Sequence, residues 1–159
     1  MGLVSSRLLL LLVGSPLVLL PAQGGQARSG KALEIKILSV VQTVTQTDVE
    51  PKGLSVGDRI TMTDRLYNLV PQFGRPKGAL VGRDSGTVTV RQGSADFRGT
   101  ARLPGGTILV RGRFPVASAL SRVTVVGGTG RFSNARGTVS IRALGTKGRA
   151  TNVFHLTLP

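Results

Sequence analysis

The chain has 159 residues, enough for one domain, and its composition excludes several kinds of site. Cysteine is absent and His155 is the only histidine, which rules out disulfides, thiolate metal sites and sites built on several histidines. The formal net charge of +14 favours anionic partners, but the arginines are spread singly along the sequence and only 4% of residues are aromatic. We therefore expect neither a metal nor a nucleic acid as partner.

The first residues have the three parts of a secretory signal peptide. Arg7 precedes an apolar stretch from Leu8 to Leu20, and small residues follow between Ala22 and Ala27. Because the apolar stretch is short and interrupted, it predicts no stable membrane span. We expect residues 1–27 to be a signal peptide, residues 28–159 to be the domain, and the mature protein to be secreted. The alternative is a retained N-terminal anchor.

From Leu33 onward the pattern is that of β-structure. β-branched residues are dense, Gly, Pro, Asp and Asn interrupt them at short intervals, and no window keeps a 3.6-residue period. The sequence predicts eight strands, near residues 33–46, 58–67, 78–91, 94–103, 106–114, 121–127, 135–145 and 149–158. Tight turns between several of them indicate an antiparallel meander, and closing the meander would remove its exposed edges. We expect an all-β protein with a single closed eight-stranded antiparallel barrel.

Apolar and polar residues alternate within the predicted strands, which places the apolar residues in the lumen and the polar ones outside. In the strand at 58–67, Ile60, Met62, Asp64 and Leu66 share one face. Asp64 is the exception on this face, because a carboxylate in an apolar lumen is costly unless it is paired, hydrogen-bonded or protonated. It is either a structural residue at the barrel rim or a general acid or base in a pocket.

Several segments, in order, resemble the dirigent proteins and the related allene oxide cyclases. The most specific is Val125-Val126-Gly127-Gly128-Thr129-Gly130-Arg131-Phe132, followed by Ala135-Arg136-Gly137. Leu80-Val81-Gly82-Arg83 and Gly106-Thr107-Ile108-Leu109 are similar to two further segments of that family. Gly127, Gly128 and Gly130 fit a structural turn after a strand, because glycine permits positive φ and close backbone approach.

The resemblance implies an eight-stranded barrel that forms a homotrimer, needs no metal or organic cofactor, and holds a small apolar molecule in its lumen. It assigns catalytic roles to Asp64 and Arg136, although the strand alternation places Arg136 on the outer face. Together with the alternation, it suggests the following residues for the pocket or for contact with the guest: Ile60, Met62, Tyr67, Phe132 and His155.

The sequence is compatible with three functions. The first is a secreted dirigent-like barrel that steers a cyclisation, coupling or isomerisation of its guest. The second is a barrel without catalysis, which carries a hydrophobic ligand or serves in the cell envelope. The third is a surface protein that binds polyanions, which would require the basic residues to gather on one face.

Overall fold

The structure is a computed structural model that describes residues 30–116, 118, 120–145 and 148–159. The predicted signal peptide, residues 1–27, lies outside the described residues. In the part of the chain that is described, no helix is both long enough and apolar enough to cross a membrane.

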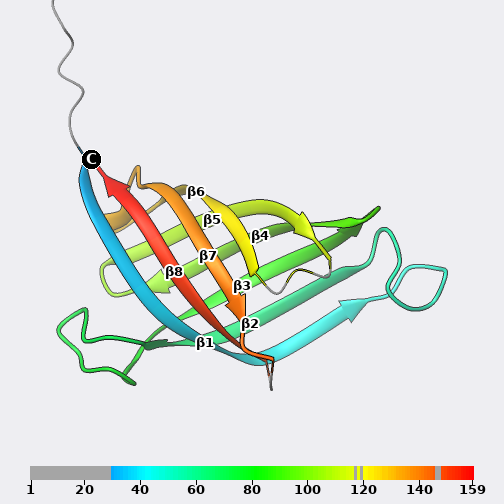
Figure 1. Cartoon of the computed structure of the whole chain (residues 1–159), viewed down its shortest axis with the longest axis horizontal. Helices are drawn as coiled ribbons and strands as arrows, with labels where there is room; N and C mark the ends of the chain where they lie inside the picture. Colours follow the sequence, from blue (N-terminus) through cyan, green and yellow to red (C-terminus); the bar gives the residue numbers. More distant parts are fainter. Residues whose placement is uncertain (1–29, 117, 119, 146–147) are drawn as a thin grey trace, which may run out of the picture.

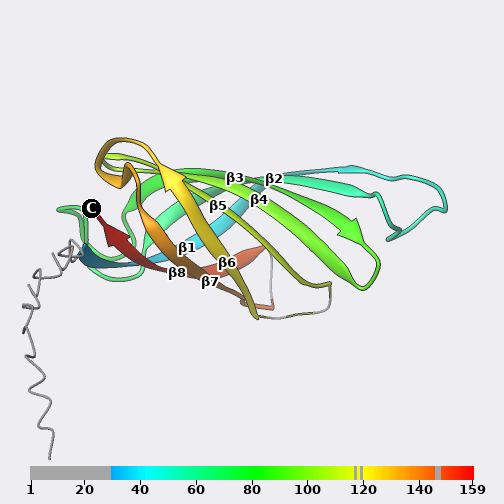
Figure 2. The same ribbon diagram turned by 90° about the horizontal axis from the view of Figure 1, so that it is seen from above.

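Eight antiparallel strands close into one barrel, in which each strand pairs with its sequence neighbours and β8 pairs with β1 (Figure 1). This confirms the predicted fold. The strands are β1 (Lys31–Thr47), β2 (Arg59–Asn68), β3 (Leu80–Arg91), β4 (Ser94–Leu103), β5 (Gly106–Pro115), β6 (Leu120–Gly128), β7 (Arg136–Ala143) and β8 (Arg149–Leu158). The end of β1 and the start of β2 project beyond the rest of the barrel (Figure 2).

Side chains alternate between lumen and outer surface as the sequence predicts. On β4, Ala95, Ala101 and Leu103 are buried, whereas Arg98 and Arg102 between them are exposed. Burying alternate apolar side chains removes them from water, at about 25 cal/mol per Å² of apolar surface, while the polar row stays hydrated. The hydrophobic effect therefore fixes which face of each strand looks inward.

One end of the lumen is packed solid. Fourteen buried apolar residues form one cluster there, with Phe132, Ile37, Leu66 and Ile108 completely buried. Farther along the lumen the inward side chains leave space between them and surround a cavity, whose wall includes Ala101, Val123, Val139 and Phe154 at the edge of this cluster. The barrel is thus divided between an apolar plug and a hollow part.

The glycine-rich stretch after β6 builds the packed end. One turn of 3₁₀ helix, η1 (Gly130–Phe132), follows the strand and carries Phe132 into the plug. Gly130 has φ +58°, and a Cβ on it would collide with the backbone carbonyl of Gly105. Only glycine combines this backbone conformation with such a close approach.

Candidate active site

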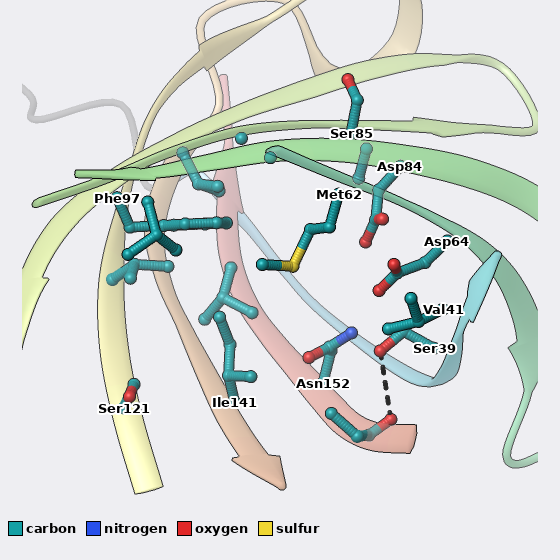
Figure 3. Close-up of a pocket in the computed structure, with 18 of the residues that line it drawn as sticks. Ser39, Val41, Met62, Asp64, Asp84, Ser85, Phe97, Ser121, Ile141 and Asn152 are labelled. Atoms are coloured by element: carbon teal, nitrogen blue, oxygen red, sulfur yellow. Dashed lines mark hydrogen bonds between the residues drawn. The ribbon is translucent and has the colours of Figure 1, made fainter. Parts of the chain in front are cut away.

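The hollow part of the lumen is a half-open cavity of about 360 Å³ (Figure 3). Its volume falls within the range of about 300–1,000 Å³ that is typical of small-molecule sites. Most of its wall is apolar, formed by Val41, Met62, Val88, Phe97, Val110, Phe114, Val123, Val139, Ile141 and Phe154. Such a wall favours a guest with a largely apolar surface.

The ring of Phe97 forms much of the apolar wall because two glycines leave room for it. A Cβ on Gly86 would lie 2.6 Å from Cε2 of this ring, and one on Gly99 would lie 2.8 Å from its Cζ. Phe114 packs beside Phe97, with ring centroids 6.4 Å apart and planes tilted by 47°. The two glycines and two aromatic rings together set the width of the cavity.

Polar groups line the cavity along four neighbouring strands. Asn152 comes from β8, Ser39 from β1, Asp64 from β2 and Asp84 from β3, and all four point into the lumen (Figure 3). The cavity therefore has a polar strip facing an apolar wall. An apolar guest with one oxygen-bearing edge would match both surfaces.

The two carboxylates are direct cross-strand neighbours. Asp64 pairs with Asp84 in the β2–β3 register, and both side chains point to the same face of the sheet. The Cβ atoms of such a pair lie about 5 Å apart. Asp64 is only 8% exposed, and its Oδ1 has no hydrogen-bond partner among the described residues. A buried carboxylate with an unsatisfied oxygen is costly when it is charged.

Burial and mutual repulsion favour the protonated form of both acids. Burial, helped by the negative charge of Asp64, raises the pKa of Asp84 to about 7. Burial also raises the pKa of Asp64, although a hydrogen bond from Ser39 opposes the shift. Because two adjacent carboxylates resist ionising together, the pair retains a proton near neutral pH. It can then serve as acid and base at once.

Two further polar residues border the pair. The Ser39 hydroxyl lies 3.4 Å from the carbonyl oxygen of Ala150 and beside Asp64, and its single proton can be donated to either acceptor (Figure 3). The side chain of Asn152 is buried and makes no hydrogen bond to any described residue. An amide offers both donors and an acceptor, so Asn152 can bind an oxygen or a hydroxyl of a guest.

The structure places only some of the predicted site residues in the cavity. Asp64 and Met62 line it, as expected from the strand alternation. Ile60 and Tyr67 also belong to β2, but neither is among the lining residues. Ile60 lies nearer the projecting start of the strand, and Tyr67 follows the inward-facing Leu66 and therefore belongs to the outer side.

Three more of the predicted residues also lie outside the cavity. Phe132 is completely buried, but it lies in the apolar plug and not in the cavity. His155 lies on the outer wall, with its Nδ1 3.4 Å from a carboxylate oxygen of Glu34. Arg136 is exposed and donates to the carbonyl oxygen of Val126 at 3.4 Å. This exposure agrees with the strand alternation, which placed Arg136 on the outer face.

Sequence reasoning missed Asp84 as a member of the site. The signal was present, because Asp84 shares its strand face with Gly86, Val88 and Val90 as Asp64 does with Met62 and Leu66. Ser39 and Asn152 were missed too, since isolated polar residues in strands carry little information. Arg149, at the start of β8, is the one arginine among the described residues that line the cavity.

The fold and the site together define a class of protein: a closed antiparallel barrel with an acid pair in an apolar lumen. The model of the family described as "Dirigent-like protein" matches residues 38–158. The chain therefore belongs to the dirigent-like family.

Two curated relatives come from Arabidopsis thaliana. The chain is 36% identical to Dirigent protein 16 over 106 residues, which is 62% of this chain and 43% of that protein. It is 34% identical to Dirigent protein 18 over 127 residues, which is 76% of this chain and 50% of that protein. The chain thus spans about half the length of the curated relatives it matches.

Solved structures share the fold at low sequence identity. A pyocyanin demethylase superposes with a TM-score of 0.65 at 22% identity, covering 79% of this chain and 100% of the other. A pterocarpan synthase dirigent protein gives 0.57 at 22% identity, covering 79% and 82%. An exo-specific intermolecular Diels-Alderase gives 0.65 at 15% identity, covering 80% and 98%. At these identities the likeness establishes the barrel alone.

Proposed function

We propose that this barrel binds a small, mostly apolar molecule in its lumen and steers a cyclisation, coupling or isomerisation of it. The observation that carries the proposal is the Asp64–Asp84 pair on the wall of an otherwise apolar cavity. A shaped cavity limits the conformations of a reactive guest, and holding reacting atoms together supplies much of the rate of such reactions. The names of the pterocarpan synthase and the Diels-Alderase support a ring-forming reaction.

The acid pair gives the proposal a chemical step. The protonated member donates its proton to an oxygen of the guest, and the ionised member accepts a proton from a carbon or hydroxyl of the same guest. One proton enters and one leaves, so the net reaction is an isomerisation or ring closure that needs no oxidant. Asn152 orients the oxygen that receives the proton, because its amide faces the same space.

The test measures product stereochemistry with a panel of reactive guests. Phenoxy radicals generated by a separate oxidase and quinone methides are the two classes that the family resemblance suggests. Products are separated by chiral chromatography. Wild-type protein should give an enantiomeric excess with at least one class, and Asp64→Asn and Asp84→Asn should each reduce it together with the rate. The matched control is His155→Gln, on the outer wall, which should behave as wild type.

A carrier without catalysis is the second candidate, favoured by the largely apolar wall of the cavity. The neutral fluorescent probe N-phenyl-1-naphthylamine distinguishes the two. Ile141→Trp fills the cavity and should abolish probe binding, whereas exposed Val126→Trp should not. Probe binding without stereocontrol of any guest in the panel would favour the carrier. No binding by wild type would contradict both functions.

Secretion and assembly complete the proposal. Residues 1–27 would direct export, and expression of the full chain followed by sequencing of the exported N-terminus tests this. The homotrimer implied by the family resemblance predicts a sedimentation mass three times that of one chain. A single-chain mass at micromolar concentration would contradict it.

A further inference from the structure

Five arginines that are scattered in the sequence come together on the outer wall of β2 to β5. In the strand register Arg65 lies opposite Arg83, and Arg83 lies opposite Arg102. On the next pair of strands, Arg98 lies opposite Arg111. We call these five residues the arginine wall. All five are exposed, and none of their guanidinium groups makes a hydrogen bond or an ion pair with any described residue.

Among the described residues, no carboxylate on the outer face forms an ion pair with the arginine wall. Asp96, on the same outer face of β4, is already held by Arg91 at 2.9 Å and by Arg113 at 2.7 Å. Asp64 and Asp84 border the wall along their strands, but their side chains point into the lumen (Figure 3). Like charges directly opposite each other destabilise a sheet. Folding therefore does not explain this arrangement, whereas an anionic partner would.

A row of hydroxyls lies between the two groups of arginines. Thr63, Ser85 and Thr100 are cross-strand neighbours, two residues from Arg65, Arg83 and Arg102 on their respective strands. Arg98 lies two residues from Thr100 on the other side. Two residues along a strand span about 7 Å. The hydroxyl row is thus a floor with guanidinium groups on both sides.

Two surface grooves follow this pattern and share the hydroxyl floor. One, of about 460 Å³, is lined by Arg65, Arg83 and Arg102, and the other, of about 530 Å³, by Arg98 and Arg111. Asp64 and Asp84 also border the first groove, from the lumenal side of their strands. Ser85 and Thr100 line both grooves, so the two are continuous across the sheet. Guanidinium groups bind carboxylates and sulfates in bidentate fashion, and hydroxyls suit sugar hydroxyls.

We infer that the arginine wall binds a linear acidic polysaccharide. Within the described residues, no aromatic side chain lines either groove, and Tyr67, two residues beyond Arg65, would offer a single ring. Successive aromatic rings are what single-stranded nucleic acids stack on. A second copy of the chain would bring the same positive wall or another part of a +14 chain to it. A chain of carboxylated or sulfated sugars matches both the cations and the hydroxyl floor.

The experiment uses polygalacturonate and heparin as probes, with dextran as the neutral control and polydeoxythymidine as the nucleic-acid comparison. Binding is measured by calorimetry at low and physiological salt. Wild-type protein should bind both acidic polysaccharides, bind dextran undetectably, and lose affinity steeply as salt rises. The triple variant Arg65→Gln, Arg83→Gln, Arg102→Gln should lose about tenfold or more in affinity, because three charge-assisted contacts are removed.

A matched variant removes the same number of charges elsewhere. Lys52→Gln, Lys77→Gln, Arg142→Gln changes three exposed cations outside the grooves and should lose less than about threefold, through general attraction alone. Circular dichroism and thermal unfolding verify that both triple variants fold. Equal losses in the two variants, or absence of wild-type binding at low salt, would overturn the inference. Tighter binding of polydeoxythymidine than of either polysaccharide would replace the proposed partner with a nucleic acid.

Discussion

Asp64 and Asp84 face each other across the β2–β3 ladder, both on the lumenal side. Two acids at directly opposed positions repel when both are charged, and neither has a basic partner among the described residues. The fold therefore carries a cost that depends on pH. That cost gives the first prediction.

Stability should fall as the pH rises from about 4 to about 7. The ordinary pKa of an aspartate is 3.8, and in the folded protein burial and Asp64 raise the pKa of Asp84 to about 7. Between these values the folded protein keeps a proton that the unfolded chain has lost, so raising the pH favours unfolding. The loss is on the order of 2 to 4 kcal/mol, at about 1.4 kcal/mol per unit of pKa difference. Urea denaturation at a series of pH values measures it.

Replacing Asp84 removes most of this dependence. Asp84→Asn keeps the size of the side chain but carries no titrating proton, so its free energy of unfolding should be nearly constant between pH 5 and pH 8. At pH 8 the variant should be more stable than wild type. The exposed Asp48→Asn should keep the wild-type slope. A wild-type slope in Asp84→Asn would show that the titrating group is another residue.

The loop between β1 and β2 depends on Asp58. This carboxylate is completely buried and accepts hydrogen bonds from the backbone N–H groups of Val49, at 2.8 Å, and Ser55, at 2.9 Å, which lower its pKa. Asp58→Ala should lower the Tm by several degrees, because two backbone N–H groups of the loop lose their acceptor. Asp48→Ala, whose carboxylate accepts only a long bond from Gly53 in the open, should change the Tm little. Equal Tm values for the two variants would refute this role.

The pKa of Asp58 also sets the sign of its pH dependence. A carboxylate with a lowered pKa stabilises the fold above its ordinary pKa, and the stabilisation is lost as the pH falls through the folded value. Loss of the Asp58 contribution therefore lowers the stability at the acidic end of the pH range, whereas ionisation of Asp84 lowers it toward neutral pH. The wild-type stability should peak between the two windows, near pH 4 to 5.

Gly86→Ala should push the ring of Phe97 out of place. The added Cβ would lie 2.6 Å from Cε2 of the ring, so the ring must move within the lumen. Overpacking of this kind costs about 1–3 kcal/mol. Ser85→Ala, the neighbouring position with an outward side chain, should stay within about 0.5 kcal/mol of wild type. Of these two variants, only Gly86→Ala should bind N-phenyl-1-naphthylamine more weakly. Unchanged stability and binding in Gly86→Ala would show that the cavity wall rearranges at little cost.

The turn after β6 can be tested with two glycines of similar conformation. Gly130 has φ +58° and Gly74 has φ +67°, but a Cβ on Gly74 would meet nothing within 4 Å. Gly74→Ala should cost about 1–2 kcal/mol for the left-handed backbone alone. Gly130→Ala adds a collision with the Gly105 carbonyl and should cost clearly more, measured by urea denaturation. Similar costs for the two would mean that the backbone at Gly105 yields easily.

The sequence predicted the barrel well because its signal is repeated in every strand. Apolar and polar residues alternate in each of the eight strands. An error in the reading of one strand therefore does not change the predicted fold, because the other strands still indicate it. The same alternation placed Asp64 and Met62 in the lumen correctly. The cavity was harder to predict, because whether an inward position belongs to the plug or to the hollow part depends on side chains from other strands, as Phe132 shows.

The cross-strand register was not readable from the sequence. The opposition of Asp64 and Asp84, and the gathering of Arg65, Arg83 and Arg102, both depend on which residue of one strand lies beside which residue of the next. Turn lengths and a bulge in the β2–β3 ladder, between Leu66 and Tyr67, set this register. Charges that look scattered along a chain can therefore form rows on a sheet.

The apolar plug determines how a bound molecule enters and leaves the barrel. With Phe132 and its neighbours filling one end, a molecule that enters the hollow part must leave by the way it came. If the proposed reaction takes place in the cavity, its substrate and its product use the same opening. A product that is more compact or less flexible than its precursor passes through that opening faster. A single opening would therefore favour reactions that make the bound molecule more compact, such as ring closures.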